Sequence, residues 1–123
     1  MKSLYIDGQS GASGDMILGA LIDLGVDPDA IRGRLTPILP SDFDLEDTGV
    51  SPNGIAATRV NVKVSEDVKH RHLPQVLALL DRGDLSPAVR KRVEGVFHRL
   101  ATAEAKVHSS TIEKVHFHEV GAN

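Results

Sequence analysis

Four of the six histidines stand as two pairs, each with one residue between its members. His70 and His72 lie in VKHRHLP, whereas His116 and His118 lie in EKVHFHEVG, directly before Glu119. Imidazole nitrogen is a common metal ligand and suits nickel, zinc and iron. Residues two apart on a strand project from the same face, so such a pair could bind one ion between its rings. The spacing favours metal ligation, with exposed surface histidines as the alternative.

A second candidate for chemistry is the stretch DGQSGASGDM, which follows the short run SLYID. Small residues let a ligand approach the backbone closely, and the start of a helix offers N–H groups to a phosphate. Asp15 would repel a phosphate unless a cation intervened. The spacing matches neither GxGxxG nor a Walker loop, so a tight strand-to-helix turn is the alternative. The candidate ligand-binding residues are Asp7, Ser10, Gly11, Ser13 and Gly14.

Composition limits the possible metal ligands and partners further. The chain has 123 residues, 41% hydrophobic and 25% charged, which is typical of one globular domain. It has no cysteine, so a metal would be bound by His nitrogen and carboxylate oxygen. The net charge of −3, without a basic run, argues against a nucleic-acid partner. No secretory or membrane-spanning apolar stretch is present, which predicts a cytoplasmic protein without a membrane partner.

The N-terminal part predicts a strand followed by two helices. Residues 3–7 have a strand-like pattern, and a helix is expected from a cap at Ser13 to a stop at Gly25. A second helix should start at Asp27 and Pro28. Apolar side chains cover most of the first helix, which predicts that it is well buried. These side chains are Met16, Ile17, Leu18, Ala20, Leu21, Ile22 and Leu24.

A β-hairpin is expected next. The arms are residues 43–50 and 55–64, joined through the turn sequence SPNG. Polar and apolar residues alternate in the second arm, as in a half-buried antiparallel strand. The residues predicted to share its inner face are Thr58, Val60, Val62 and Val64.

The C-terminal half predicts two helices and a last strand. Residues 73–80 form a short helix, and a long helix runs from a cap at Ser86 and Pro87 to about His108. The sequence EKVHFHE is expected to be a strand whose Phe117 faces the core. The order strand, helices, strand, strand, helices, strand predicts an α+β fold in one domain. It matches a ferredoxin-like (split βαβ) arrangement with extra helices.

Four blocks of sequence resemble one family. In order they are SGASGDM, HRHL, AEAKVH and VHFHEVGA, within residues 5–122. Together they are similar to the N-terminal part of LarC, the family that inserts nickel into the nickel-pincer nucleotide cofactor of lactate racemase. The resemblance implies a CTP-dependent nickel insertase, or cyclometallase, of the lyase class. Its substrate would be pyridinium-3,5-bisthiocarboxylic acid mononucleotide, in which nickel joins two sulfurs and one carbon.

The resemblance also implies roles for the candidate residues. Ni(II) would be bound or transferred by His70, His72, His116 and His118, and the Gly/Ser loop would receive the mononucleotide phosphate. Forming a nickel–carbon bond requires loss of a ring proton, for which Asp15 and Glu119 are the candidate catalytic acceptors.

Members of the family are longer than this chain. Residues 1–123 are therefore expected to be an N-terminal fragment whose partner is the C-terminal part of the same protein. CTP with Mn(II) or Mg(II) would bind to that part.

Two other functions compete with an insertase fragment. One is a histidine-rich nickel-binding or storage module without catalysis, and the other is an assembly domain with incidental histidines. The valine-rich hairpin would have an exposed edge, so homo-oligomer formation is also open.

Overall fold

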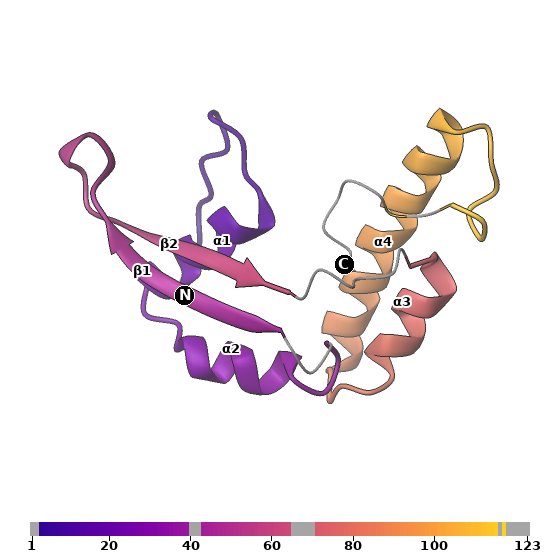
Figure 1. The fold of residues 1–123 in the computed structure, drawn as a ribbon, viewed down its shortest axis with the longest axis horizontal. Coiled ribbons are helices and arrows are strands. Elements are labelled where there is room, and N and C mark those ends of the chain that lie inside the picture. The colour runs from indigo at the N-terminus through magenta and orange to yellow at the C-terminus, as the bar shows by residue number, and fades with distance from the viewer. Residues whose placement is uncertain (1–2, 40–42, 65–70, 116, 118–123) are drawn as a thin grey trace.

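The computed structural model describes residues 3–39, 43–64, 71–115 and 117. Within them, a hairpin with two short helices forms one group of elements, and two antiparallel helices form the other (Figure 1). The elements in chain order are α1 (Gly14–Asp23), α2 (Pro28–Leu35), β1 (Asp44–Val50), the 3-10 turn η1 (Pro52–Gly54), β2 (Ala57–Lys63), α3 (Leu73–Leu80) and α4 (Pro87–Val107).

The predicted α+β class is confirmed, but the ferredoxin-like order is not observed in the described part of the chain. The sheet there has two strands, in the order β1-β2. Residues 3–7 are not a strand, because no described segment pairs with their backbone. The described residues of the predicted last strand, 113–115 and 117, are also outside any strand. The residues 116, 118 and 119 of that prediction lie outside the described part.

The predicted hairpin is confirmed. β1 and β2 pair antiparallel from Asp44 opposite Lys63 to Val50 opposite Ala57. The SPNG turn places Asn53 and Gly54 at φ of 52° and 79°, values that suit these two residue types. The predicted inner face is only partly buried: Val60 is 3% exposed, whereas Val62 is 42% exposed.

An arginine joins α2 to the hairpin. The predicted start of α2 is confirmed, with the carboxylate of Asp27 accepting the N–H of Asp29 at 2.9 Å. Arg32 Nε donates to the carbonyl oxygen of Leu45 at 3.0 Å, and its Nη2 lies 3.4 Å from Asp47 Oδ1. These contacts hold α2 beside β1, whose Leu45 side chain is fully buried.

α1 packs closely on β2 through a glycine. A Cβ atom added at Gly19 would lie only 2.4 Å from the carbonyl oxygen of Thr58. Asp23 lies one turn after Gly19 in the helix, and its Oδ1 accepts a hydrogen bond from the Thr58 hydroxyl at 2.9 Å. The predicted stop is confirmed, because Gly25 has φ of 98° and closes the helix with N–H bonds from Gly25 and Val26 to its last turn.

The prediction that α1 is well buried is wrong for the described structure. Met16 is 54% exposed and Leu24 is 67% exposed, and Gly19 is the one buried residue of the helix. The apolar residues were predicted correctly as a helix, but among the described helices and strands only β2 packs against α1, on one face.

Replacing Gly19 with alanine is expected to destabilise the chain by about 1–3 kcal/mol, since the new methyl group would overlap the backbone oxygen of Thr58. Chemical denaturation with circular dichroism measures the effect. Gly95→Ala is the matched control, because nothing lies within 4 Å of a Cβ atom at this exposed position in α4. That change should stabilise by about 0.5–1 kcal/mol through helix propensity. Equal effects of the two changes would contradict the close packing of α1 on β2.

A core cluster of the described residues lies between α3, α4 and the segment that follows α4. Both helices have the predicted bounds, and the Ser86 hydroxyl caps α4 by accepting the N–H of Val89 at 3.3 Å. As predicted, Phe117 faces this core, where it is fully buried. Its ring packs edge to face against that of Phe97, with 5.9 Å between the ring centroids. The buried members are Leu73, Val76, Ala101, Ala105, Val115 and Phe117.

None of the helices found in the described residues has the length and apolar character needed to cross a membrane.

Candidate functional site

The two histidine motifs are brought together by the fold. The N–H of Phe117 donates to the carbonyl oxygen of Arg71 at 3.3 Å. These are the middle residues of HRH and HFH, so the two motifs are in backbone contact at their centres. His70, His116, His118 and Glu119 themselves lie outside the described residues.

A histidine side chain makes the second contact between the motifs. His72 Nδ1 lies 3.0 Å from the carbonyl oxygen of Val115, a residue 43 positions later in the chain. A carbonyl oxygen only accepts, so Nδ1 carries the hydrogen and donates it. In the neutral ring the lone pair is then on Nε2. Metal-binding histidines commonly donate their other ring N–H to a backbone carbonyl in this way.

Each partner of this contact is held by its own local structure. The N–H of His72 donates to Gln75 Oε1 at 2.9 Å, and the N–H of Gln75 donates to the carbonyl of His72 at 3.0 Å, so His72 is the N-cap of α3. On the other side, the N–H of Val115 donates to Thr111 at 3.2 Å, and the Val115 side chain is buried in the core. The ring of His72 is therefore oriented by two ordered segments.

Sequence reasoning missed the residues that position His72. Gln75 stands three residues after a helix cap, a spacing typical of a capping box that could have identified it. The carbonyl of Val115 carries no such signal, because any residue has one. Among the described residues, no three His, Asp or Glu side chains are close enough to bind a metal ion. With three of the four proposed histidines outside that part, the full ligand set stays a prediction.

The Gly/Ser loop forms a sequence of tight turns. Asp7 Oδ1 accepts the N–H of Gln9 at 3.1 Å, and the N–H of Gly11 donates to Gly8 at 2.9 Å. Ser13 is the N-cap residue of α1, as predicted, but its hydroxyl donates to Asp15 instead of accepting a helix N–H. This bond, aided by the N–H of Met16, lowers the pKa of Asp15 below its usual value. Asp15 is therefore ionised at neutral pH.

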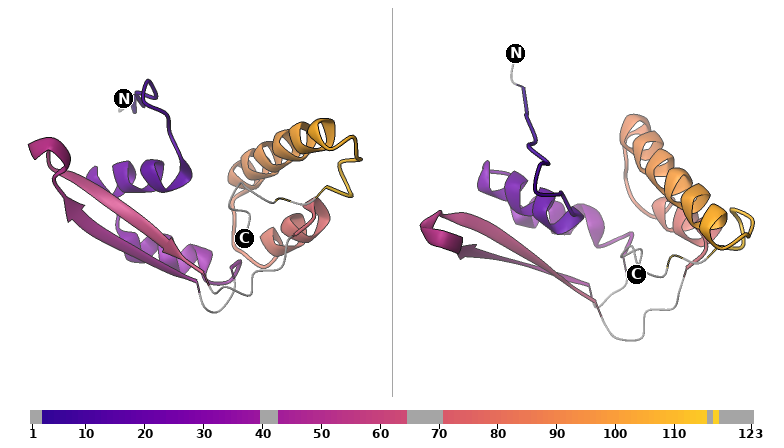
Figure 2. Two further views of the ribbon diagram at one scale, coloured as in Figure 1. Left: turned by 45° about the horizontal axis from the view of Figure 1, so that its top comes forward. Right: turned by 90° about the horizontal axis from the view of Figure 1, so that it is seen from above.

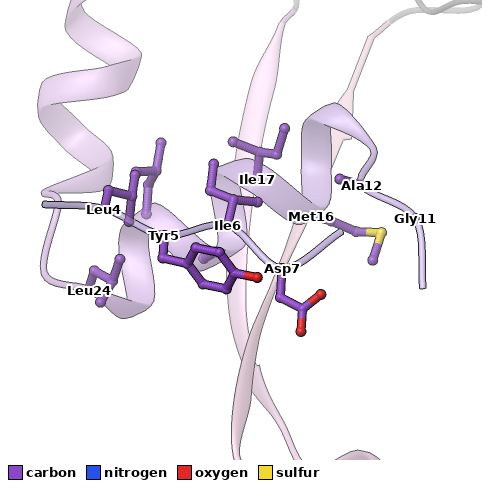
Figure 3. A pocket seen from close by; sticks show the side chains of 11 residues that line it. Leu4, Tyr5, Ile6, Asp7, Gly11, Ala12, Met16, Ile17 and Leu24 are labelled. Atoms are coloured by element: carbon purple, nitrogen blue, oxygen red, sulfur yellow. The ribbon is translucent and has the colours of Figure 1, made fainter. Parts of the chain in front are cut away.

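The loop residues face two different hollows. Asp7 and Gly11 line an apolar cavity of about 270 Å³ beneath residues 4–6 (Figure 3). Asp15 lines a larger, more polar hollow of about 730 Å³ against the hairpin, where Arg59 is also present. Ser10, Ser13 and Gly14 are not among the residues that line either hollow. Arg59 was not predicted as a site residue, and its place on the outer face of an alternating strand gave no signal for one.

The loop and the histidine motifs lie beside different elements. The loop precedes α1 next to the hairpin, whereas the contacts of His72 lie between the start of α3 and the segment after α4 (Figures 1 and 2). The fold thus brings together two of the three predicted parts, and the Gly/Ser loop is in the other group of elements.

An oriented histidine between two paired motifs, in an α+β fold, defines a candidate metal-binding protein. Residues 4–123 match the family described as nickel insertion protein. The chain belongs to this family, which confirms the resemblance seen in the sequence.

Curated relatives with more specific names align with 99% of the chain. Three named pyridinium-3,5-bisthiocarboxylic acid mononucleotide nickel insertion protein come from Desulfitobacterium hafniense (strain DSM 10664 / DCB-2), Geobacillus kaustophilus (strain HTA426) and a Nocardioides species. Their identities to the chain are 42%, 40% and 43%, over 30%, 32% and 31% of their own lengths. The chain thus spans about a third of the length of these relatives. No solved structure matches it.

Proposed function

We propose that this chain is the N-terminal part of a cytoplasmic nickel insertase, which installs Ni(II) into pyridinium-3,5-bisthiocarboxylic acid mononucleotide. Membership of the nickel insertion family and the names of the relatives support this substrate. The sequence resemblance further implies a CTP-dependent lyase that makes the cofactor of lactate racemase. CTP, with Mn(II) or Mg(II), is assigned to the C-terminal remainder of the full-length protein.

The observation that carries the proposal is the hydrogen bond from His72 Nδ1 to the carbonyl of Val115. With Nδ1 donating to Val115, the lone pair of the neutral ring is on Nε2, which would be the ligating nitrogen. The bond also fixes the orientation of a ring of the first motif against the backbone of the second. Contact between the backbones of Arg71 and Phe117, the sequence neighbours of the remaining histidines, supports a shared site for both motifs. Nickel delivered as a substrate would then be bound between HRH and HFH, since imidazole suits Ni(II).

The two candidate carboxylates have different roles in this proposal. Because its pKa is lowered, Asp15 is a weak proton acceptor and is better suited to holding a cation near the mononucleotide phosphate. The ring proton lost when nickel bonds to carbon would go to Glu119. The phosphate itself would be received by the Gly/Ser loop at Asp7, Ser10, Gly11, Ser13 and Gly14.

A chimera tests the function. This chain replaces the matching 30% of the Desulfitobacterium hafniense relative, and mass spectrometry follows nickel incorporation into the mononucleotide. The intact chimera should form the nickel product. Glu119→Gln should still bind nickel but slow product formation by about 100-fold or more, as expected when a general base is lost. Glu113→Gln, an exposed glutamate of the same segment, is the control and should change neither.

Each negative result has a distinct meaning. Nickel binding without product in the intact chimera would favour the storage module instead. Neither binding nor product would favour the assembly domain. Unchanged product formation in Glu119→Gln would eliminate that residue as the proton acceptor.

A further inference from the structure

The N-terminal segment exposes apolar side chains on both of its sides. Tyr5 is 86% exposed, whereas Leu4 and Ile6 are 58% and 55% exposed although they border the cavity over α1. Leu4 and Ile6 project to one side of the segment and Tyr5 to the other (Figure 3). This alternation is that of a β-strand.

The segment lies on the outer face of α1. Gly19 and Asp23 face β2, whereas Ile17, Leu21 and Leu24 line the cavity on the other side of the helix, with residues 4–6. The segment and the hairpin are seen on opposite sides of α1 (Figure 2). Among the described residues, α1 therefore has the hairpin against one face and a single extended segment over the other.

Within the described part of the chain, the backbone N–H and C=O groups of residues 3–6 make no backbone hydrogen bond. An apolar, strand-like stretch with unpaired N–H and C=O groups is a template for another strand. A helix that is apolar nearly all round is, likewise, typical of one buried on two sides. A further layer of structure, paired with this segment and packed on the outer face of α1, would explain both incorrect predictions: the strand at 3–7 and the well-buried α1.

The length of the relatives indicates where that layer comes from. This chain covers 30–32% of three relatives, so about two-thirds of each protein is not represented in it. We infer that residues 3–7 form an edge strand that pairs with a β-strand from this remaining polypeptide, which also covers the outer face of α1. Such strand addition gives affinity through main-chain hydrogen bonds and selectivity through alternate side chains. A second copy of the chain is a poorer occupant, since two isolated short strands are only marginally stable.

Amide hydrogen exchange tests the inference independently of nickel chemistry. Exchange at residues 4–7 is compared between the 123-residue chain and the chimera with the remaining part of the Desulfitobacterium hafniense relative. We expect exchange in the chimera to be slower by about 100-fold or more, because the amides become bonded in a sheet. Ile6→Asp in the chimera should restore fast exchange. Val96→Asp, at a position of α4 that is 63% exposed, is the matched control and should leave exchange slow.

Two outcomes would overturn the inference. One is equally fast exchange at residues 4–7 in the chimera and in the isolated chain. The other is slow exchange in the isolated chain that depends on its concentration, together with a dimer in sedimentation, which would identify a second copy as the occupant. Neither outcome depends on whether the chimera inserts nickel.

Discussion

Replacing Phe117 with alanine should destabilise the chain by about 3–5 kcal/mol, as expected for truncation of a fully buried aromatic side chain. The ring fills the core between α3 and α4 and contacts Phe97. Urea denaturation followed by circular dichroism measures the loss. Because Phe117 is also the middle residue of the second histidine motif, nickel affinity should fall together with stability.

Two further changes at this core separate packing from other effects. Phe117→Leu keeps most of the apolar volume and should cost about half as much or less. Val96→Ala removes an exposed side chain from α4 and should change stability by less than about 0.5 kcal/mol. A Phe117→Ala variant as stable as Val96→Ala would show that the segment after α4 does not pack in the core.

Replacing His72 with alanine should weaken nickel binding by at least about 10-fold, since one oriented ring nitrogen is lost. Isothermal titration calorimetry measures the affinity. Global stability should change by less than about 1.5 kcal/mol, because a hydrogen bond such as that to Val115 contributes about that much or less and His72 is partly exposed. The function proposed for the paired motifs depends on this separation of affinity from stability.

The control for His72 is a histidine outside the motifs. His98 is an exposed residue of α4 and has no proposed role, so His98→Ala should leave nickel affinity unchanged. A His72→Ala variant that binds nickel as tightly as His98→Ala would contradict ligation by His72. Equal weakening in both variants would instead indicate non-specific binding to surface histidines.

Local signals predicted much of the fold. Asp27 with Pro28 and Ser86 with Pro87 mark the starts of α2 and α4, because side-chain caps and a fixed proline φ act within one turn. The SPNG turn and the stop at Gly25 were predicted for a similar reason. Tolerance of a positive φ depends on the residue type, and Gly and Asn have it.

Interactions with distant segments were beyond the reach of such signals. Residues 3–7 have a strand pattern, yet a strand also requires a partner, and none is among the described residues. The apolar circumference of α1 predicted burial, but burial depends on what lies against each face.

In the candidate site, too, local features were predicted from the sequence and contacts between distant segments were not. Residue type and spacing identified the two histidine motifs, whereas the contact between Arg71 and Phe117 depends on how the segment after α4 returns to α3. The lowered pKa of Asp15 likewise depends on the direction of the Ser13 hydroxyl. The sequence identifies Ser13 as a capping residue but does not say whether its hydroxyl bonds to the helix backbone or to Asp15.

X-ray absorption spectroscopy at the nickel edge tests most directly whether the paired histidine motifs bind nickel. With one equivalent of Ni(II) bound to the chain, we expect the outer-shell scattering of several imidazole rings, and a weaker signal in His72→Ala. A nickel ion surrounded only by oxygen ligands, with a spectrum that His72→Ala leaves unchanged, would contradict nickel binding between HRH and HFH.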